Sequence, residues 1–440
     1  MKKENSISEK PERHCPRKLS DYLKVAGKKK VHSLVDKVYK LKNIEFAWKR
    51  VRSNRGKHGV DGISIEEYEE NLKEELQRLH KELKTDSYRA QPVRRVDIPK
   101  KGSPGKMRSL GIPSVKDRVC QQALLNRLEP IFEETFDESS FGYRKGRSTR
   151  DALGKIWREV NAGSEWILDA DLKDYFGSVD HNKLMTLVAQ RVSDGRVLKL
   201  IHQMLETGVM EKGRLFPSTR GTPQGAVTSP LLSNILLTPF DKEMRRKGYK
   251  LTRWADDWVV TCTSRQQAQS VLETARRILE KLGVTLNMQK TRIVHVKHGF
   301  EFLGYKIKQG KGQLRLPRNR IKSQLNKKEL YARPTEKSVT RFKEAIRSWT
   351  KRKTPLKTED LVQRINPVIR GWGNYYNRAH VRKLFNQLDR WIERRLWSHR
   401  FKRWRNCGWK VLPTGKLIEE YGLVRLIHLI PSIANKRLHS

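Results

Sequence analysis

The stretch that decides the fold is Leu251-Thr-Arg-Trp-Ala-Asp-Asp-Trp-Val-Val-Thr-Cys262. Apolar and β-prone residues flank the adjacent carboxylates Asp256 and Asp257, so the stretch predicts a β-hairpin with its acids at the turn. Two neighbouring carboxylates repel each other and resist burial unless a positive charge compensates them. Because hard oxygen ligands suit Mg²⁺, a metal site is one interpretation of the pair. A solvated acidic turn between two ordinary strands is the other.

The charge balance of the chain indicates a polyanionic partner. The 440 residues include 94 Lys and Arg against 48 Asp and Glu, a formal net charge of +46. This surplus is far larger than solubility requires, and nucleic acid is the partner that it favours. The 11 Trp, 12 Tyr and 12 Phe offer ring faces for base stacking, although most aromatic side chains in proteins belong to the core.

Composition also argues against several other classes of protein. The four cysteines are scattered without a C-x-x-C pair, which argues against a disulfide framework and against a cysteine zinc site. No apolar run approaches the roughly 18 residues that span a membrane, and the N-terminus lacks the apolar core of a signal peptide. We therefore expect a soluble protein of a reducing compartment.

A second predicted strand carries further acids. Residues 165–172 alternate so that Asp169 and Asp171 share one face of the strand. Together with Asp256 and Asp257, Asp171 completes three carboxylates from two separate strands. Two-metal phosphoryl transfer uses acids on rigid neighbouring strands, which hold two Mg²⁺ about 3.5–4 Å apart. With the net charge of +46, this pattern favours a nucleic-acid polymerase.

Two loops and one tail add to this pattern. Strands predicted at 93–99 and 109–113 enclose a basic, glycine-rich loop, which suits a phosphate cradle as well as an ordinary solvated hairpin tip. Residues 220–234 form a turn-rich loop that leads into an apolar helix. Residues 1–34 are polar and basic and lack a core of their own.

In their order and spacing, the sequence blocks of residues 36–405 make the chain resemble a bacterial group II intron-encoded reverse transcriptase and maturase. The block Ile369–Tyr376 is similar to the hallmark of the maturase X domain, and Trp254-Ala-Asp-Asp257 is similar to the family's Tyr-Ala-Asp-Asp box. The matching blocks are Gly59–Gly62, Ile98–Lys100, Arg108–Pro113, Ser140–Arg144, Asp171–Phe176, Thr222–Gly225, Ser229–Asn234, Trp254–Asp257, Phe302–Tyr305 and Ile369–Tyr376.

The resemblance implies an α/β right-hand polymerase with an antiparallel palm sheet, followed by an all-helical thumb and a basic C-terminal segment. The expected divisions are a basic tail at 1–34, an N-terminal extension and fingers at 35–165, a palm at 166–315, a thumb or maturase X domain at 316–383 and a nucleic-acid-binding segment at 384–440. Within the palm, Phe302–Tyr305 would be the strand that grips the primer.

The resemblance also implies the catalytic roles. Asp171, Asp256 and Asp257 would hold two Mg²⁺, or Mn²⁺ in their place, with the Leu172 carbonyl as a further ligand. Asp169 shares the strand face but matches no ligand position, so it would at most lie behind the ligands. The nucleotide-binding residues would be Lys100 and Arg108 on the triphosphate, Phe176 under the sugar to reject a 2′-hydroxyl, Gln224 at the nascent base pair and Lys290 near the leaving pyrophosphate.

A basic helix is predicted from about 384 to 404. Six cations with few acids favour phosphate contact over a merely solvated face. These cations are Arg394, Arg395, Arg400, Lys402, Arg403 and Arg405. Just before this helix, Trp372, Tyr375 and Tyr376 recur at helical spacing, and we expect at least two of these three aromatic side chains to be core.

The chain departs from the family pattern at two positions: Trp254 replaces the usual Tyr, and Ala226 replaces a second Gly. Neither departure removes an acid. The family's optional endonuclease carries Cys pairs and a His-Asn-His set after the thumb. The chain shows no such pattern there, so we expect no DNA-cleaving domain.

The expected activity is Mg²⁺-dependent, RNA-directed DNA synthesis that also assists intron splicing. Its partners would be intron RNA, an RNA template with a DNA primer, deoxynucleoside triphosphates and target DNA, in a cytoplasmic, nucleoid-associated bacterial ribonucleoprotein with no membrane. Two alternatives remain open. The first is an RNA-binding maturase without polymerase activity, and the second is a domesticated or defence-associated enzyme that is not tied to an intron.

Overall fold

The predicted hairpin at 251–262 is confirmed, and it lies in an antiparallel sheet. The computed structural model describes residues 30–99, 105, 107–211, 213–311, 328–402 and 410–431. The strands of this sheet follow the order β6-β7-β3-β8. Their bounds are β3 (Trp166–Asp171), β6 (Lys250–Trp254), β7 (Asp257–Cys262) and β8 (Arg292–His295). The two predicted acid-bearing strands are therefore direct neighbours.

Alternation along β3 and β7 divides the interior into two cores. Leu168 of β3 and Val260 of β7 belong to a first core, which they share with α11 (Ser229–Arg246) and α12 (Arg265–Lys281). Ile167 and Val259 point the other way, into a second core that includes α7 (Thr149–Asn161). Both faces of the sheet are thus packed, because successive side chains of a strand point to opposite faces.

The N-terminal part of the chain builds a second sheet and a helical layer. The predicted hairpin at 93–99 and 109–113 is confirmed, with β1 (Val93–Pro99) paired to β2 (Met107–Ile112). β4 (Val209–Glu211) and β5 (Arg214–Phe216) extend it in the order β2-β1-β4-β5. The helices of this part are α2 (Val35–Val38), α3 (Leu41–Ser53), α4 (Ile65–Glu70), α5 (Leu72–Lys84), α6 (Val115–Glu133), α8 (Tyr175–Ser178), α9 (His181–Ala189) and α10 (Gly195–Glu206).

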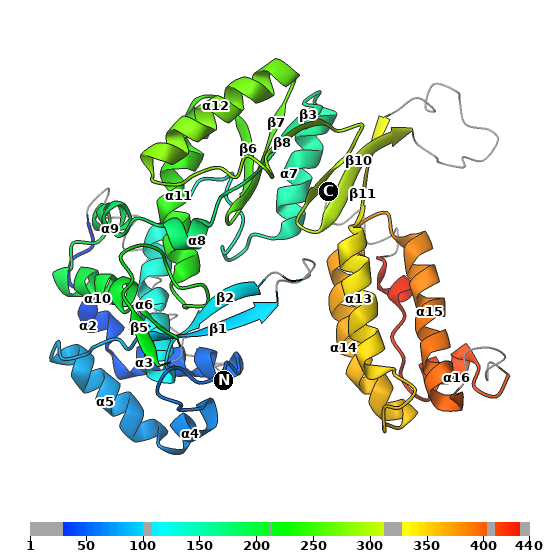
Figure 1. Cartoon of the computed structure of the whole chain (residues 1–440), viewed down its shortest axis with the longest axis horizontal. Coiled ribbons are helices and arrows are strands. Elements are labelled where there is room, and N and C mark those ends of the chain that lie inside the picture. The colour runs from blue at the N-terminus through cyan, green and yellow to red at the C-terminus, as the bar shows by residue number, and fades with distance from the viewer. Residues whose placement is uncertain are drawn as a thin grey trace, which may run out of the picture.

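A helical region follows this mixed α/β part, and Figure 1 shows it set apart from the N-terminal helices, below the sheet of β6, β7, β3 and β8. A small sheet, ordered β11-β10-β9, connects the two parts. Its members are β9 (Phe300–Phe302), β10 (Tyr305–Lys311) and β11 (Lys328–Pro334), and the helices are α13 (Glu336–Trp349), α14 (Thr358–Tyr376), α15 (Arg382–Phe401), α16 (Thr414–Glu419) and the short 3₁₀ helix η2 (Leu426–Leu429). No helix in the described ranges is long and apolar enough to cross a bilayer.

The second core joins α15 to α13 and α14, although the sequence analysis placed residues 384–440 in a separate segment. Phe342, Ile365 and Leu388, one from each of these helices, are all buried in it. The segment 410–431 folds back onto the same core. Asp389 of α15 accepts hydrogen bonds from the backbone N–H groups of Leu426 (2.8 Å) and Ile427 (3.1 Å).

We predict that Asp389→Ala loosens the returning segment. Two backbone N–H groups would lose their acceptor, and because each loss costs about 1–3 kcal/mol, amide exchange around Leu426 should accelerate by about 30-fold or more. Hydrogen exchange read by mass spectrometry measures this effect. The matched control is Asp360→Ala, which removes an exposed acid from α14 and should leave that exchange unchanged. Equal protection of 422–429 in both variants would contradict the docking.

Candidate active site

The predicted acids converge at one end of the β6-β7-β3-β8 sheet. Asp171 and Asp257 lie directly opposite each other on β3 and β7. Cβ atoms of such partners are about 4.5–5.5 Å apart, and both side chains point to the same face. Asp256 occupies the turn that precedes β7, and Asp169 shares the face of Asp171 by alternation. Three carboxylates from two strands are thereby gathered, with a fourth behind them.

Electrostatic repulsion within this group is strong. Burial, followed by the charges of Asp169, Asp256 and Asp171, raises the pKa of Asp257 to about 8. Burial likewise raises the pKa of Asp169 to about 6, and it raises the pKa of Asp256 above its ordinary value. The site therefore holds more negative charge than its surroundings compensate, which is the environment that favours a bound cation.

Lys290 provides part of the missing positive charge. Its ammonium group pairs with Oδ2 of Asp171, so Lys290 lies on a predicted metal ligand. As the side chains stand, no group of three or more His, Cys, Asp or Glu in the described ranges is arranged to hold a metal ion. The donor chemistry nevertheless fits a hard divalent ion, because carboxylate oxygens from adjoining strands face one another. Such an ion would compete with Lys290 for Asp171.

The Leu172 carbonyl belongs to the same strand end. The Leu172 side chain is buried, and its backbone forms an isolated bridge with Leu286. On either side of it, the Asp171 carbonyl accepts from the Asn287 N–H (2.8 Å) and the Lys173 N–H donates to the Thr285 carbonyl (2.9 Å). The segment that carries Lys290 is thus held along the end of β3.

A cavity of about 570 Å³ lies beside two of the predicted nucleotide-binding residues. Phe176 and Gln224 both line it, and Gln224 Oε1 accepts a hydrogen bond from Nε of Arg108 (2.7 Å). Backbone hydrogen bonds connect the segments that line the cavity. The Thr222 N–H donates to the Phe176 carbonyl (2.7 Å), and the Gly111 N–H donates to the Gln224 carbonyl (2.8 Å). Arg108, Phe176 and Gln224 are brought together, while Lys100 lies outside the described residues.

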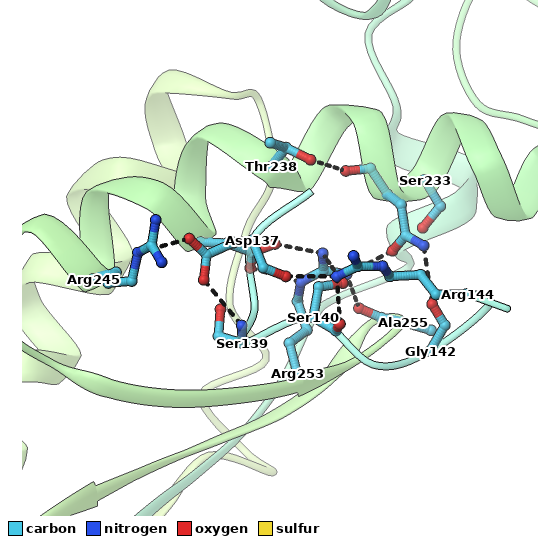
Figure 2. A network of polar contacts seen from close by, with 12 residues as sticks. Asp137, Ser139, Ser140, Gly142, Arg144, Ser233, Thr238, Arg245, Arg253 and Ala255 are labelled. Atoms are coloured by element: carbon cyan, nitrogen blue, oxygen red, sulfur yellow. Dashed lines mark hydrogen bonds and ion pairs between the residues drawn. The ribbon is translucent and has the colours of Figure 1, made fainter. Parts of the chain in front are cut away.

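A buried arginine that sequence reasoning missed holds the turn of the hairpin (Figure 2). Arg253 is 0% exposed, as is Asp241, with which it forms a bidentate ion pair at 2.7 and 2.5 Å. Its remaining donors bind three acceptors on separate segments. These are Oδ1 of Asn234 (3.0 Å), Oγ of Ser140 (2.8 Å) and the Ala255 carbonyl (2.9 Å).

The loop 139–144 packs against the same turn. The Arg253 N–H donates to the Ser139 carbonyl (2.8 Å), and the Phe141 N–H donates to the Arg253 carbonyl (2.9 Å). Ala255 has φ 59°, a left-handed conformation that is strained for alanine. A Cβ on Gly142 would lie 2.5 Å from the Ala255 nitrogen, so glycine is required there. The residue that precedes Asp256 is therefore held from both sides.

Two aromatic residues border this turn. Trp254, the family departure, is half-buried and packs against the second core, so its indole is a packing group at the edge of the site. The second is Tyr143, which the sequence analysis did not include among the site residues. It is 52% exposed with φ 60°, and partial burial together with the charge of Asp256 raises its pKa. Its strained backbone is invisible in a sequence.

The cations of the predicted basic face differ in exposure and in hydrogen bonding. Arg394, Arg400 and Lys402 are exposed. Arg395 is half-buried, and its guanidinium donates to Thr350 Oγ1 (3.0 Å) and to the Thr350 carbonyl (2.5 Å) at the end of α13. The Lys402 ammonium donates to the Arg352 carbonyl (2.6 Å). Arg403 and Arg405 lie outside the described residues.

Comparison with known proteins identifies the class. Residues 98–307 match the family "Reverse transcriptase (RNA-dependent DNA polymerase)", and residues 339–413 match "Group II intron, maturase-specific domain". The first range contains the gathered acids together with Phe176 and Gln224 of the cavity. The second contains most of the helical region. The chain is thus built as a reverse transcriptase with a maturase region.

Individual relatives agree with this class. The Escherichia coli (strain K12) protein YkfC is 35% identical over 296 residues, which cover 58% of this chain and 77% of YkfC. The group II intron-encoded protein LtrA of Lactococcus lactis subsp. cremoris is 29% identical over 421 residues, which cover 78% of this chain and 69% of LtrA. The chain belongs to the group II intron reverse transcriptase and maturase family, an RNA-dependent DNA polymerase family.

Among solved structures, the partial Cas6-RT-Cas1--Cas2 complex covers 57% of this chain and 42% of its own chain, with 23% identity and a TM-score of 0.36. This likeness is too low to support a conclusion.

We predict that the Arg253 network fixes the reaction centre rather than merely stabilising the fold. Asp241→Leu alone leaves a buried, unpaired guanidinium and should lower the free energy of unfolding by about 3–5 kcal/mol. The double variant Arg253→Met/Asp241→Leu removes both charges and should recover most of that loss. It still lacks the donor to the Ala255 carbonyl, so kcat for nucleotide addition should fall by about tenfold or more while the KM for primer–template stays unchanged.

Thermal unfolding and steady-state primer extension on the same preparations measure the two effects. A folded double variant with the kcat of the unaltered chain would show that the network serves stability alone.

Proposed function

We propose that this chain copies RNA into DNA at the Asp171, Asp256 and Asp257 centre and also binds intron RNA to assist splicing and mobility. The observation that carries the proposal is the direct pairing of Asp171 with Asp257 across β3 and β7, beside the Asp256 turn. The strong mutual repulsion of these acids supports a cation-dependent role for them. The cavity that Phe176 and Gln224 line supplies a place for the nucleotide beside them.

In this proposal the acids form the metal site of the polymerase. Asp171, Asp256 and Asp257 would hold two Mg²⁺, with Mn²⁺ as a substitute and the Leu172 carbonyl as an added ligand. Bound there, the ions would supply the positive charge that activates the primer 3′-hydroxyl and neutralises the departing pyrophosphate. Lys290 would then be released from Asp171 and lie near the pyrophosphate as a cation.

The neighbouring cavity would select and orient the nucleotide. Arg108, held by Gln224, would present its guanidinium to the triphosphate together with Lys100. Phe176 is only 7% exposed, so its ring has little freedom to move aside for a 2′-hydroxyl. Deoxynucleoside triphosphates would therefore be the preferred substrates, on an RNA template with a DNA primer.

The helical region would bind intron RNA, and mobility would add target DNA as a partner. The maturase-specific family match and the exposed cations Arg394 and Arg400 support this part. The proposed setting is a bacterial ribonucleoprotein in the cytoplasm. The proposed chain divisions remain those of the sequence analysis, with α15 contributing to the thumb core as well as to the basic face.

Asp256→Ala should abolish cDNA synthesis on a primed RNA template, because it removes a proposed metal ligand from the turn. Primer extension measures the activity, and filter binding of the same RNA shows whether the variant still folds and binds. Glu273→Ala is the matched control, since Glu273 is an exposed acid on α12 that neither lines the cavity nor is proposed as a ligand. Extension by Asp256→Ala at the rate of the unaltered chain would overturn the assignment. Splicing without extension by the unaltered chain would favour a binding-only maturase.

RNA affinity should fall steeply between about 50 and 200 mM salt, because bound cations release counterions from phosphates. Arg394→Ala/Arg400→Ala should make the slope of log K against log salt shallower by about 1.5–2, at little cost to stability. Arg395→Ala is the contrasting variant. It should leave the salt slope nearly unchanged but lower the melting temperature, because Arg395 caps α13 through Thr350. An unchanged slope in the Arg394/Arg400 variant would contradict this assignment.

A further inference from the structure

The turn between β9 and β10 is strained and needs support. Leu303 and Gly304 have φ values of 50° and 75°. Positive φ at both central residues is typical of a tight two-residue hairpin, in which asparagine or glycine usually occupies the first position. A leucine there is unfavourable by itself, because its Cβ crowds the backbone in the left-handed region. The surrounding structure must therefore hold this turn in place.

Two tyrosines of the maturase-specific region hold it. The hydroxyl of Tyr375 donates a hydrogen bond to the Leu303 carbonyl (2.9 Å). The hydroxyl of Tyr376 bonds the Gly304 carbonyl (3.1 Å) and the Ser338 hydroxyl (2.9 Å). Both carbonyls of the turn are thus bound by the last turn of α14, which lies below β10 in Figure 1.

The fit between the turn and the tyrosines is close. A Cβ on Gly304 would lie 2.8 Å from the Tyr376 hydroxyl. The Gly304 carbonyl also accepts from the backbone N–H of Thr335 (3.0 Å), the N-cap of α13. The ring of Tyr305 lies against both tyrosines, with centroid distances of 5.4 Å to Tyr375 and 4.8 Å to Tyr376. The turn is consequently bound by both α13 and α14.

Core packing explains only part of the role of the three aromatic residues Trp372, Tyr375 and Tyr376. The prediction that at least two of the three aromatics are core agrees with Tyr376, which is 4% exposed, and with Trp372, which is half-buried and stacks on Phe342 at 4.5 Å. Tyr375 is different because it is 38% exposed. Its hydroxyl, rather than its buried area, is what connects it to the turn.

The same end of α14 also contacts the palm. Arg150 of α7 donates to the Asn374 carbonyl (3.2 Å). Helix α7 begins just after the 139–144 loop that packs on the Ala255 turn. Leu303 and Trp254 also pack against one shared core. The end of α14 is therefore connected to both hairpins of the palm, the one with the acids and the one with the strained turn.

We propose that Tyr375 and Tyr376 are positioning residues for polymerisation: they fix the Leu303-Gly304 turn and so set the place of the primer strand at the acids. This inference rests on the proposed function and on the family resemblance, which implies that Phe302–Tyr305 grips the primer.

The test compares Tyr375→Phe, Tyr376→Phe and the double variant in steady-state primer extension. Loss of both hydroxyls should raise the KM for primer–template by about 5–50-fold. At saturating primer–template, kcat for adding one nucleotide should stay within about twofold. Tyr421→Phe is the matched control, because it removes a hydroxyl from the same helical region away from the turn and should change neither parameter.

A second variant perturbs the turn while keeping both hydroxyls. Gly304→Ala places a methyl group against the Tyr376 hydroxyl at a positive φ and should also raise the KM for primer–template. An unchanged KM in the double phenylalanine variant, with an active unaltered chain, overturns this inference alone. Absence of extension by the unaltered chain contradicts the proposed function and this inference with it.

Discussion

The ion pair between Arg253 and Asp241 is the interaction on which the geometry of the site depends. Both side chains are 0% exposed, so each ion has lost its water, at an effective cost of several kcal/mol. A bidentate contact and three further acceptors offset that cost. The pair also joins α11, β6 and the loop at Ser140 at one point. Because the charge must stay paired, these segments cannot move apart, and the Asp256 turn is fixed between them.

Much of the palm could be predicted from local pattern. Alternation around Asp256 and Asp257 predicted the hairpin, and alternation at 165–172 placed Asp171 on a strand; both are local signals of period two. The Arg253 network could not be predicted, because its partners Ser140 and Asn234 are 113 and 19 positions away. The contact of Lys290 with Asp171 spans 119 positions and was missed for the same reason. A composition argument also could not separate Arg395, which bonds Thr350, from its exposed neighbour Arg394.

Two hairpin turns with left-handed residues lie close to the second core, one at Ala255 and one at Leu303. Each is strained by itself, and each is held by a side chain: Arg253 lies two positions before Ala255, whereas Tyr375 lies 72 positions after Leu303. The Arg253 guanidinium donates a hydrogen bond to the Ala255 carbonyl of the first turn, and the Tyr375 hydroxyl donates one to the Leu303 carbonyl of the second. Strain that is held in this manner keeps a site organised before its substrates arrive, because little reorganisation is left to occur on binding. The helical region thereby contributes to the order of the turn between β9 and β10.

The central claim is that the acids of β3 and β7 form one cation site. Iron(II) in place of Mg²⁺, with ascorbate and peroxide, generates hydroxyl radicals that cut the backbone next to the bound ion. Mapping these cuts by mass spectrometry tests the claim most directly. We predict cuts near both Asp171 and Asp256–Asp257 that disappear as Mg²⁺ is added. Cuts confined to other parts of the folded, RNA-binding chain would contradict it.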